Sequence, residues 1–143
     1  MSRKASAQLI RAGLLVLTLF VSSCATADVH SVIALPNGYY LQQNKAGQPS
    51  LVKRSGGTVI PGPIAAYKVY RDWVTGALGA TAGKRGVYTN DLPFHGGPDT
   101  RYFVLDTSSG KLESGLDEAT WKSRLTALGA PPNLEIYAPL LPD

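Results

Sequence analysis

The sequence predicts an α+β fold, in which an antiparallel β-meander sheet is packed by one C-terminal α-helix. Two patterns support this prediction: short apolar runs alternate with strong turn signals along most of the chain, and one stripe of helical spacing follows near its end. Tight turns join only strands that run in opposite directions, so closely spaced turns favour antiparallel neighbours.

The expected strands are short apolar runs bounded by Gly, Pro, Asn and Ser. Residues 36–38 (Pro-Asn-Gly) form a typical turn sequence. Residues 61–63 (Pro-Gly-Pro) should end a strand firmly, because proline cannot donate to a sheet ladder. Residues 101–106 are apolar on both faces, which indicates a central strand. The full set of expected strands is 31–35, 39–43, 50–54, 58–60, 64–70, 73–78, 101–106 and 111–113, with a final edge strand at 134–137.

The single helix is marked at both ends. Ser114 and Asp117 resemble a capping box, and Asp117 and Glu118 place negative charge where the helix dipole favours it. Gly129 suits a left-handed residue after the helix, and the prolines at 131–132 prevent its continuation. The apolar stripe expected to face the sheet consists of Trp121, Leu125 and Leu128.

The first 23 residues have the layout of an export signal. Basic residues precede an apolar run at 12–21, which is well short of the ~20 residues that span a bilayer. Val21-Ser22-Ser23-Cys24 then resembles the lipobox of bacterial lipoprotein precursors. The resemblance implies diacylglycerol on the Cys24 thiol, cleavage before Cys24 and acylation of the new amino group. We therefore expect a signal peptide at 1–23, a lipidated N-terminus and short tether at 24–30, and a single globular domain at 31–143.

Two features of the N-terminal region concern location. Ala25 follows the modified cysteine, and in lipoproteins of the enterobacterial type a residue other than aspartate there implies the outer membrane, facing the periplasm. The alternative is that Ala25-Thr26-Ala27 acts as an ordinary signal-peptidase site. Cleavage before Asp28 would then discard Cys24 and release a soluble periplasmic protein.

Composition narrows the class of partner. Removing 23 of the 143 residues leaves 120, the size of one ordinary domain. Three of the 14 basic residues lie in the signal, so 11 remain against ten acidic residues. This near balance, together with export, argues against nucleic acid binding. The expected partners are the membrane, through lipid on Cys24, and an unknown envelope protein or small ligand.

Candidate catalytic and metal sites are weak in this sequence. Residues 79–85 resemble a phosphate-binding loop, but the spacing is one residue short and Arg85 stands where Ser or Thr is needed. His95 lies four residues from both Asp91 and Asp99, which suggests metal binding or acid–base chemistry. A structural zinc site usually needs four ligands, and the only other histidine is His30, so a hydrogen-bonded loop histidine is the simpler interpretation. We therefore assign no catalytic residue, metal or cofactor.

The best region for function is the segment 79–100, because loops this long in small domains are usually functional or disordered. A short strand at 87–88 would divide it. The neighbours Tyr39 and Tyr40 must point to opposite faces of a strand, which leaves one of them exposed or half covered. Exposed tyrosines favour binding surfaces, although tyrosine also prefers strands for structural reasons. The seven tyrosines are Tyr39, Tyr40, Tyr67, Tyr70, Tyr88, Tyr102 and Tyr137.

These observations favour an outer-membrane-anchored periplasmic lipoprotein that acts as a binding or accessory module, without enzymatic activity. An inhibitor or immunity-type protein against an envelope-active enzyme is the alternative hypothesis. A small hydrolase or metal-dependent enzyme that uses the His95 loop is a weaker third hypothesis. Beyond the lipobox, no motif indicates a named globular family.

Overall fold

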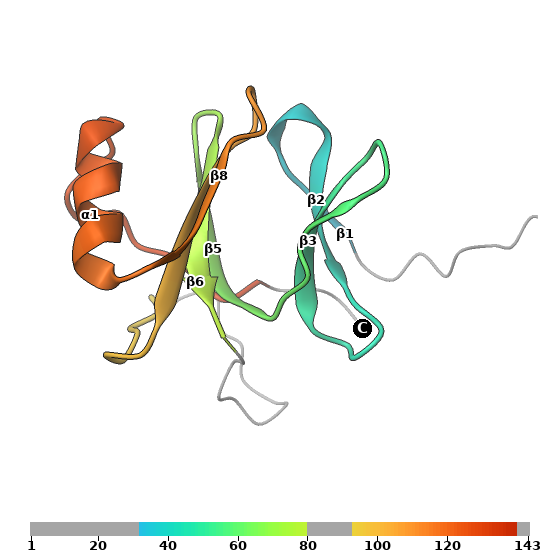
Figure 1. The fold of residues 1–143 in the computed structure, drawn as a ribbon, viewed down its shortest axis with the longest axis horizontal. Coiled ribbons are helices and arrows are strands. Elements are labelled where there is room, and N and C mark those ends of the chain that lie inside the picture. The colour runs from blue at the N-terminus through green and yellow to red at the C-terminus, as the bar shows by residue number, and fades with distance from the viewer. Residues whose placement is uncertain (1–31, 80–92, 140–143) are drawn as a thin grey trace, which may run out of the picture.

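Two four-stranded antiparallel sheets lie face to face, and one helix covers the outer face of the second sheet (Figure 1). This computed structural model describes residues 32–79 and 93–139. The strand orders are β1-β2-β3-β4 and β5-β6-β7-β8, so the predicted α+β class with a C-terminal helix on the sheet is confirmed. The elements are β1 (Val32–Ala34), β2 (Tyr39–Gln43), β3 (Pro49–Lys53), β4 (Thr58–Ile60), β5 (Ile64–Tyr70), β6 (Trp73–Leu78), β7 (Arg101–Asp106), β8 (Leu112–Leu116) and α1 (Glu118–Ala127).

The meander is divided into two sheets at residues 61–63. The two prolines there cannot donate to a ladder, so β4 stops and the chain crosses to start β5 in the other layer. The Asn44 amide donates to the Pro61 carbonyl oxygen at 3.1 Å, which fixes this crossing against the β2–β3 turn. At the other end of the sandwich, Asn37 donates to the Thr107 hydroxyl at 2.9 Å and thereby joins the two layers.

Two apolar cores follow from this three-layer arrangement. β7 lies between β6 and β8, and its central residues are buried on both faces, as expected for a central strand. Tyr39 is buried and Tyr40 is half-buried, which confirms that this pair points to opposite faces. The core between the sheets contains Leu35, Tyr39, Leu41, Leu51, Ile60, Ile64, Val74, Phe103 and Leu105. The core under the helix contains Ala65, Ala66, Ala77, Tyr102, Val104, Trp121, Leu125 and Ile136.

The ends of α1 differ in part from the prediction. Asp117 is the N-cap, and its carboxylate accepts from the Thr120 amide at 2.7 Å. The assignment of Ser114 to a capping box is wrong, because β8 pairs with β7 as far as Leu116 and keeps Ser114 in the sheet. Gly129 has the predicted left-handed conformation, with φ of 74°. No helix in the described residues is long and apolar enough to cross a membrane.

The C-terminal segment departs from the predicted strand. Residues 134–137 form a single bridge to the edge of β5, in which Tyr67 and Tyr137 exchange two backbone hydrogen bonds of 2.8 and 3.0 Å. This bridge covers part of the β5 edge.

Trp121 joins the helix to the second sheet through the buried hydroxyl of Thr75. The indole nitrogen donates to Thr75 Oγ1 at 2.7 Å, and this hydroxyl donates to the Phe103 carbonyl oxygen at 2.8 Å. Trp121 is 5% exposed and Thr75 is fully buried, so both polar groups depend on this chain of bonds.

We predict that Trp121→Ala lowers the free energy of unfolding by about 3–5 kcal/mol, because it leaves a large cavity under α1. Trp121→Phe keeps most of the ring but removes the indole N–H, and should cost less than the alanine variant. Urea unfolding followed by circular dichroism measures both. A loss below about 1 kcal/mol for Trp121→Ala would contradict the buried position of the indole.

A second prediction concerns the β7–β8 turn. The Asp106 carboxylate accepts from the Ser108 hydroxyl at 2.6 Å and from the backbone amides of Ser108 and Ser109. These hydrogen bonds lower the pKa of Asp106 from 3.8 to about 2. The unfolded chain therefore binds a proton more readily than the folded protein as the pH falls from about 4 to about 2.

The stabilisation from ionised Asp106 should thus be complete above about pH 4 and disappear between about pH 4 and pH 2. We expect the wild type to be more stable than Asp106→Asn at neutral pH, with a difference that narrows through this window. Chemical unfolding of both proteins across the pH range measures the difference. A constant difference down to pH ~2 would show that the carboxylate charge has no part in stabilising the turn.

Candidate functional site

A cleft of about 260 Å³ opens beside α1, between the helix and two segments without regular secondary structure, 93–97 and 133–136. Apolar side chains form its floor and polar side chains form its rim. Its lining residues are Pro93, Phe94, His95, Gly96, Tyr102, Glu118, Trp121, Lys122, Asn133, Leu134, Glu135 and Ile136.

The floor of the cleft is an aromatic stack. The rings of Tyr102 and Trp121 lie nearly parallel, with centroids 4.3 Å apart and an interplanar angle of 11°. Tyr102 comes from β7, where the three residues after it are also buried, and Trp121 is held by its bond to Thr75. Both aromatic side chains are at most 5% exposed, so the floor is fixed by the core under the helix.

The helix contributes an ion pair to the rim. Glu118 and Lys122 are one turn apart, and their carboxylate and ammonium groups are in contact. The hydrogen bond and charge of Glu118 raise the pKa of Lys122. Burial, followed by the charge of Glu118, raises the pKa of the Tyr102 phenol, so this hydroxyl remains protonated at neutral pH. The helix side of the rim therefore offers an acceptor and a donor.

The opposite wall is held by backbone bonds. The Phe94 amide donates to the Ile136 carbonyl oxygen at 2.8 Å and ties the segment 93–97 to the C-terminal segment. The Tyr137 hydroxyl donates to the Glu135 carboxylate, and this hydrogen bond is the main cause of the raised pKa of Tyr137. Because Tyr137 is also bridged to β5, the wall is attached to the second sheet.

Of the residues that the sequence suggested for metal binding or acid–base chemistry, the structure places one at this site, beside Tyr102 from the set of candidate binding tyrosines. His95 lies on the rim with an exposed side chain, and Asp99 is exposed in the following turn. Asp91 lies outside the described residues, so its relation to His95 is not described. Within the ranges 32–79 and 93–139, no group of three or more His, Cys, Asp or Glu side chains is arranged to hold a metal ion.

Several other predictions fall outside the described residues. They are the signal peptide at 1–23, the lipobox with Cys24, the tether at 24–30 with His30, the alternative cleavage site at 25–28, residues 80–85 of the glycine-rich loop with Arg85, the 87–88 strand and Tyr88.

Sequence reasoning missed most of the rim. Glu118, Lys122, Asn133 and Glu135 look like ordinary surface residues in the sequence, and only the packing of α1 beside the irregular segment 133–136 brings them round one hollow. The one usable signal was a Glu–Lys pair at i, i+4 that brackets Trp121, the residue expected to be buried. Such a pair must lie beside the buried indole, at the border between the core and solvent.

Comparisons with protein-family models, curated proteins and solved structures found no match to this chain. The cleft combines an apolar floor with carboxylates, an ammonium group, an imidazole and an amide at its rim. This arrangement suits the binding of a group that is apolar at its centre and polar at its edge.

Gly96 allows the cleft wall to approach its floor, which yields a matched pair of substitutions. A methyl group added at Gly96 would overlap the Tyr102 hydroxyl and lie 2.8 Å from Thr100 Oγ1, whereas one added at Gly97 would meet nothing within 4 Å. We predict that Gly96→Ala lowers the free energy of unfolding by about 1–3 kcal/mol, and that Gly97→Ala changes it by less than about 0.5 kcal/mol.

Urea unfolding and hydrogen exchange at the Phe94 amide measure these effects. Exchange should become faster in Gly96→Ala, because displacing the wall breaks the bond to Ile136. Equal behaviour of the two alanine variants would show that the wall does not depend on this close approach.

Proposed function

We propose that the protein is a lipid-anchored module of the bacterial cell envelope that binds a partner protein through the cleft beside α1. The observation that carries this proposal is a small cleft with a fixed aromatic floor and a rim of mixed charge. A rigid apolar hollow that is surrounded by hydrogen-bonding groups is the usual receptor for one anchoring side chain of a partner.

The size of the cleft favours a protein partner over a free small molecule. Pockets for small ligands usually measure about 300–1,000 Å³ and enclose most of the ligand. At about 260 Å³ this cleft lies below that range, so it suits one large side chain better than a whole ligand. Glu118 and Lys122 on one side and Glu135 on the other would bind the polar atoms around such a side chain.

The anchor in this proposal comes from the lipobox at residues 21–24. Seven residues separate Cys24 from β1, and even fully extended they span at most about 25 Å. More than one acyl chain is needed for stable attachment, and the lipobox resemblance implies three. A lipidated chain would therefore hold its cleft close to the membrane surface, where it would meet other envelope components.

A crosslinking experiment in intact cells tests the cleft as the binding site. A photo-reactive amino acid is placed at His95 on the rim and, as a matched control, at the exposed Ala46 in the β2–β3 turn. We expect one partner protein to be captured from position 95 and not from position 46. Capture from both positions, or from neither, would contradict the cleft as the binding site.

The same cells test the anchor independently. Mass spectrometry of the mature N-terminus should find a triacylated Cys24 in the wild type, and Cys24→Ser should leave the outer-membrane fraction while retaining its fold. An unmodified N-terminus at Asp28, or an unchanged outer-membrane location of Cys24→Ser, would overturn the anchor. The crosslinks would still test the cleft as the binding site, because they do not depend on the lipid.

A further inference from the structure

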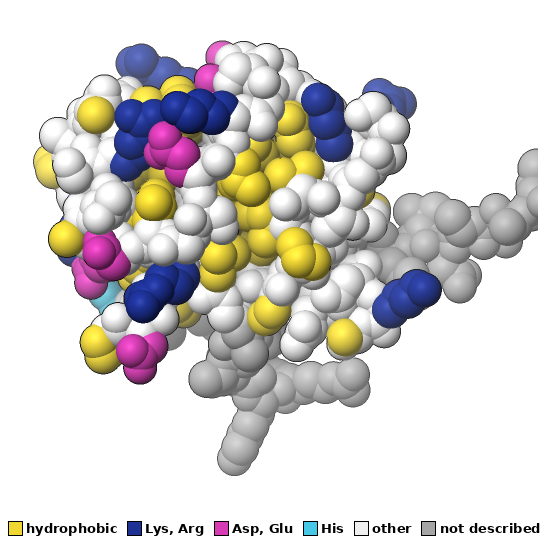
Figure 2. Space-filling model, in the orientation of Figure 1, with side chains coloured by type: hydrophobic (Ala, Val, Ile, Leu, Met, Phe, Trp, Pro, Cys, Tyr) yellow, Lys and Arg dark blue, Asp and Glu magenta, His cyan; other side chains and the backbone are white. Residues whose placement is uncertain are grey.

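The face of the sandwich shown in Figure 2 carries a band of apolar side chains between the two sheets. Two edge strands, β4 of the first sheet and β8 of the second, lie on this side of the molecule (Figure 1). Val59 from β4 and Leu112 from β8 are half-buried and pack against the core between the sheets. We call this band and the charged groups beside it the seam face.

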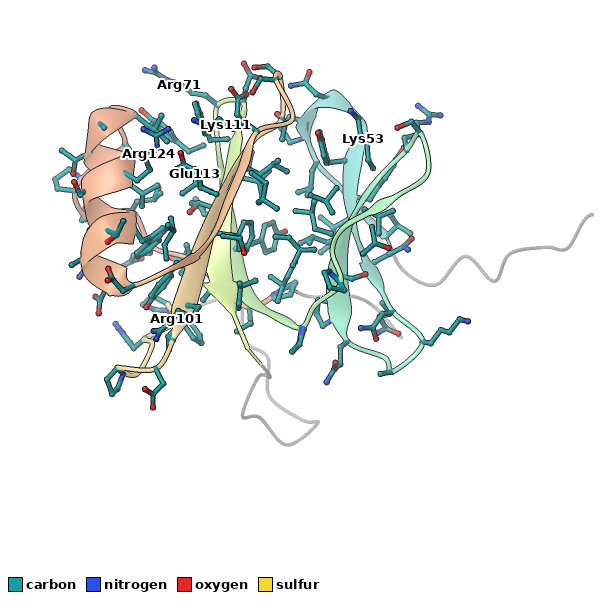
Figure 3. All side chains as sticks on the ribbon, viewed as in Figure 1. Lys53, Arg71, Arg101, Lys111, Glu113 and Arg124 are labelled. Carbon is teal, nitrogen blue, oxygen red and sulfur yellow. The ribbon has the colours of Figure 1, made fainter. Side chains whose placement is uncertain are left out.

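Cationic side chains lie on both sides of the band. Lys53 is at the end of β3, and Lys111 precedes β8 across the band (Figure 3). The side chain of Lys111 is 65% exposed, and the Lys53 ammonium lies 5.5 Å from the centre of the Tyr39 ring. Arg71 and Arg124 add two further cations on the side of the second sheet.

Two of the three acids nearest the seam face, Glu113 and Asp106, are engaged by protein groups, and the third, Asp72, follows Arg71 in the β5–β6 turn. Glu113 contacts Arg124 at 2.7 Å and Lys111 at 3.5 Å, so it offsets only one of the cations around it. Asp106 accepts hydrogen bonds within its own turn. The first sheet, residues 32–60, contains three cations and no Asp or Glu. The balance of charge around the band is therefore positive.

The two edge strands are poor templates for the addition of a peptide strand. β4 has only three residues and is followed by Pro61. β8 has an irregular register against β7, and Gly115 within it has φ of 73°. Strand addition needs a regular row of free backbone groups, which these two strands do not offer. This face is therefore better suited to a molecule that binds through apolar and charged groups.

We propose that the seam face binds the anionic phospholipid surface of a membrane. The phosphate groups would lie against Lys53 and Lys111, and the glycerol and upper acyl carbons would contact Val59 and Leu112. Cations beside an apolar strip match this order of groups in a lipid leaflet. The biological setting rests on the proposed lipid anchor, which would hold the domain beside such a surface, but the contact itself involves only the folded domain.

The test uses a chain that begins at Ala25 and therefore has neither signal peptide nor lipid. Every described strand, the helix and both cores lie within residues 32–139, so this chain keeps the whole folded body. Its binding is measured by flotation with vesicles of phosphatidylcholine alone or mixed with phosphatidylglycerol, at low and high salt. We expect binding to the mixed vesicles only, weakened by salt.

Matched pairs of substitutions locate the surface. Lys53→Gln with Lys111→Gln should weaken binding about thirty-fold, since each cation beside an anionic surface contributes about 1 kcal/mol. The control pair, Lys45→Gln with Lys68→Gln, removes the same charge from an exposed turn and from the opposite edge strand, and should weaken binding less than about three-fold. Circular dichroism verifies that all variants are folded.

Equal losses in the two pairs would show a response to net charge alone and would overturn the seam face as the site. Equal flotation with both vesicle types, or none with either, would overturn it as well. Because this chain carries no lipid, such a result would not bear on the lipid anchor, which is tested separately by the mass of the mature N-terminus. Conversely, an unmodified N-terminus in cells would contradict the lipid anchor. Binding of the unlipidated chain to vesicles would still support the seam face as a membrane-binding surface.

Discussion

The hydroxyl of Thr75 is the group on which the rest of the second sheet and the helix depend. It accepts from the Trp121 indole and donates to the Phe103 carbonyl oxygen, so one buried atom joins α1, β6 and β7. A buried indole N–H without a partner costs about 1–3 kcal/mol, a large share of the stability of a small domain. Since this hydroxyl fixes the indole, it also fixes the stack with Tyr102 and hence the floor of the cleft.

The division of the strands into two sheets explains why the second sheet carries the site. Its inner face packs on the first sheet and its outer face packs on α1, so its middle strands must be apolar on both sides. Polar side chains of these middle strands can then reach solvent at the strand ends and at the border of the helix layer. The cleft lies at this border, where the floor of Tyr102 and Trp121 is flanked by Glu118 on one side and Glu135 on the other.

Local signals predicted most of the elements, whereas the arrangement of the layers needed tertiary information. The apolar character of 101–106 and the turn residues identified the strands, because both reflect burial and backbone geometry at single positions. The prolines at 61–63 showed where a strand ends but not that a second sheet begins there. Ser114 and Asp117 both suit an N-cap, and only pairing of β8 with β7 decides between them. His95 could be singled out because imidazole chemistry is visible in the sequence. Its neighbours on the rim come from separate segments, and no local sequence pattern predicts that these segments lie side by side.

The two proposed surfaces differ in charge in a way that would orient an anchored domain. The first sheet, residues 32–60, carries Lys45, Lys53 and Arg54 and no acid, so it contributes only positive charge. The rim of the cleft, in contrast, holds Glu118 and Glu135 against the single ammonium of Lys122, with Asp117 next to it in sequence, so its balance is negative. An anionic leaflet attracts the first group and repels the second over about a Debye length, 8–10 Å. If the seam face lies on the membrane, the same field turns the cleft toward the aqueous side, where a partner protein has access to it. Membrane contact and partner binding would then occur together, because different layers of the fold supply the two surfaces.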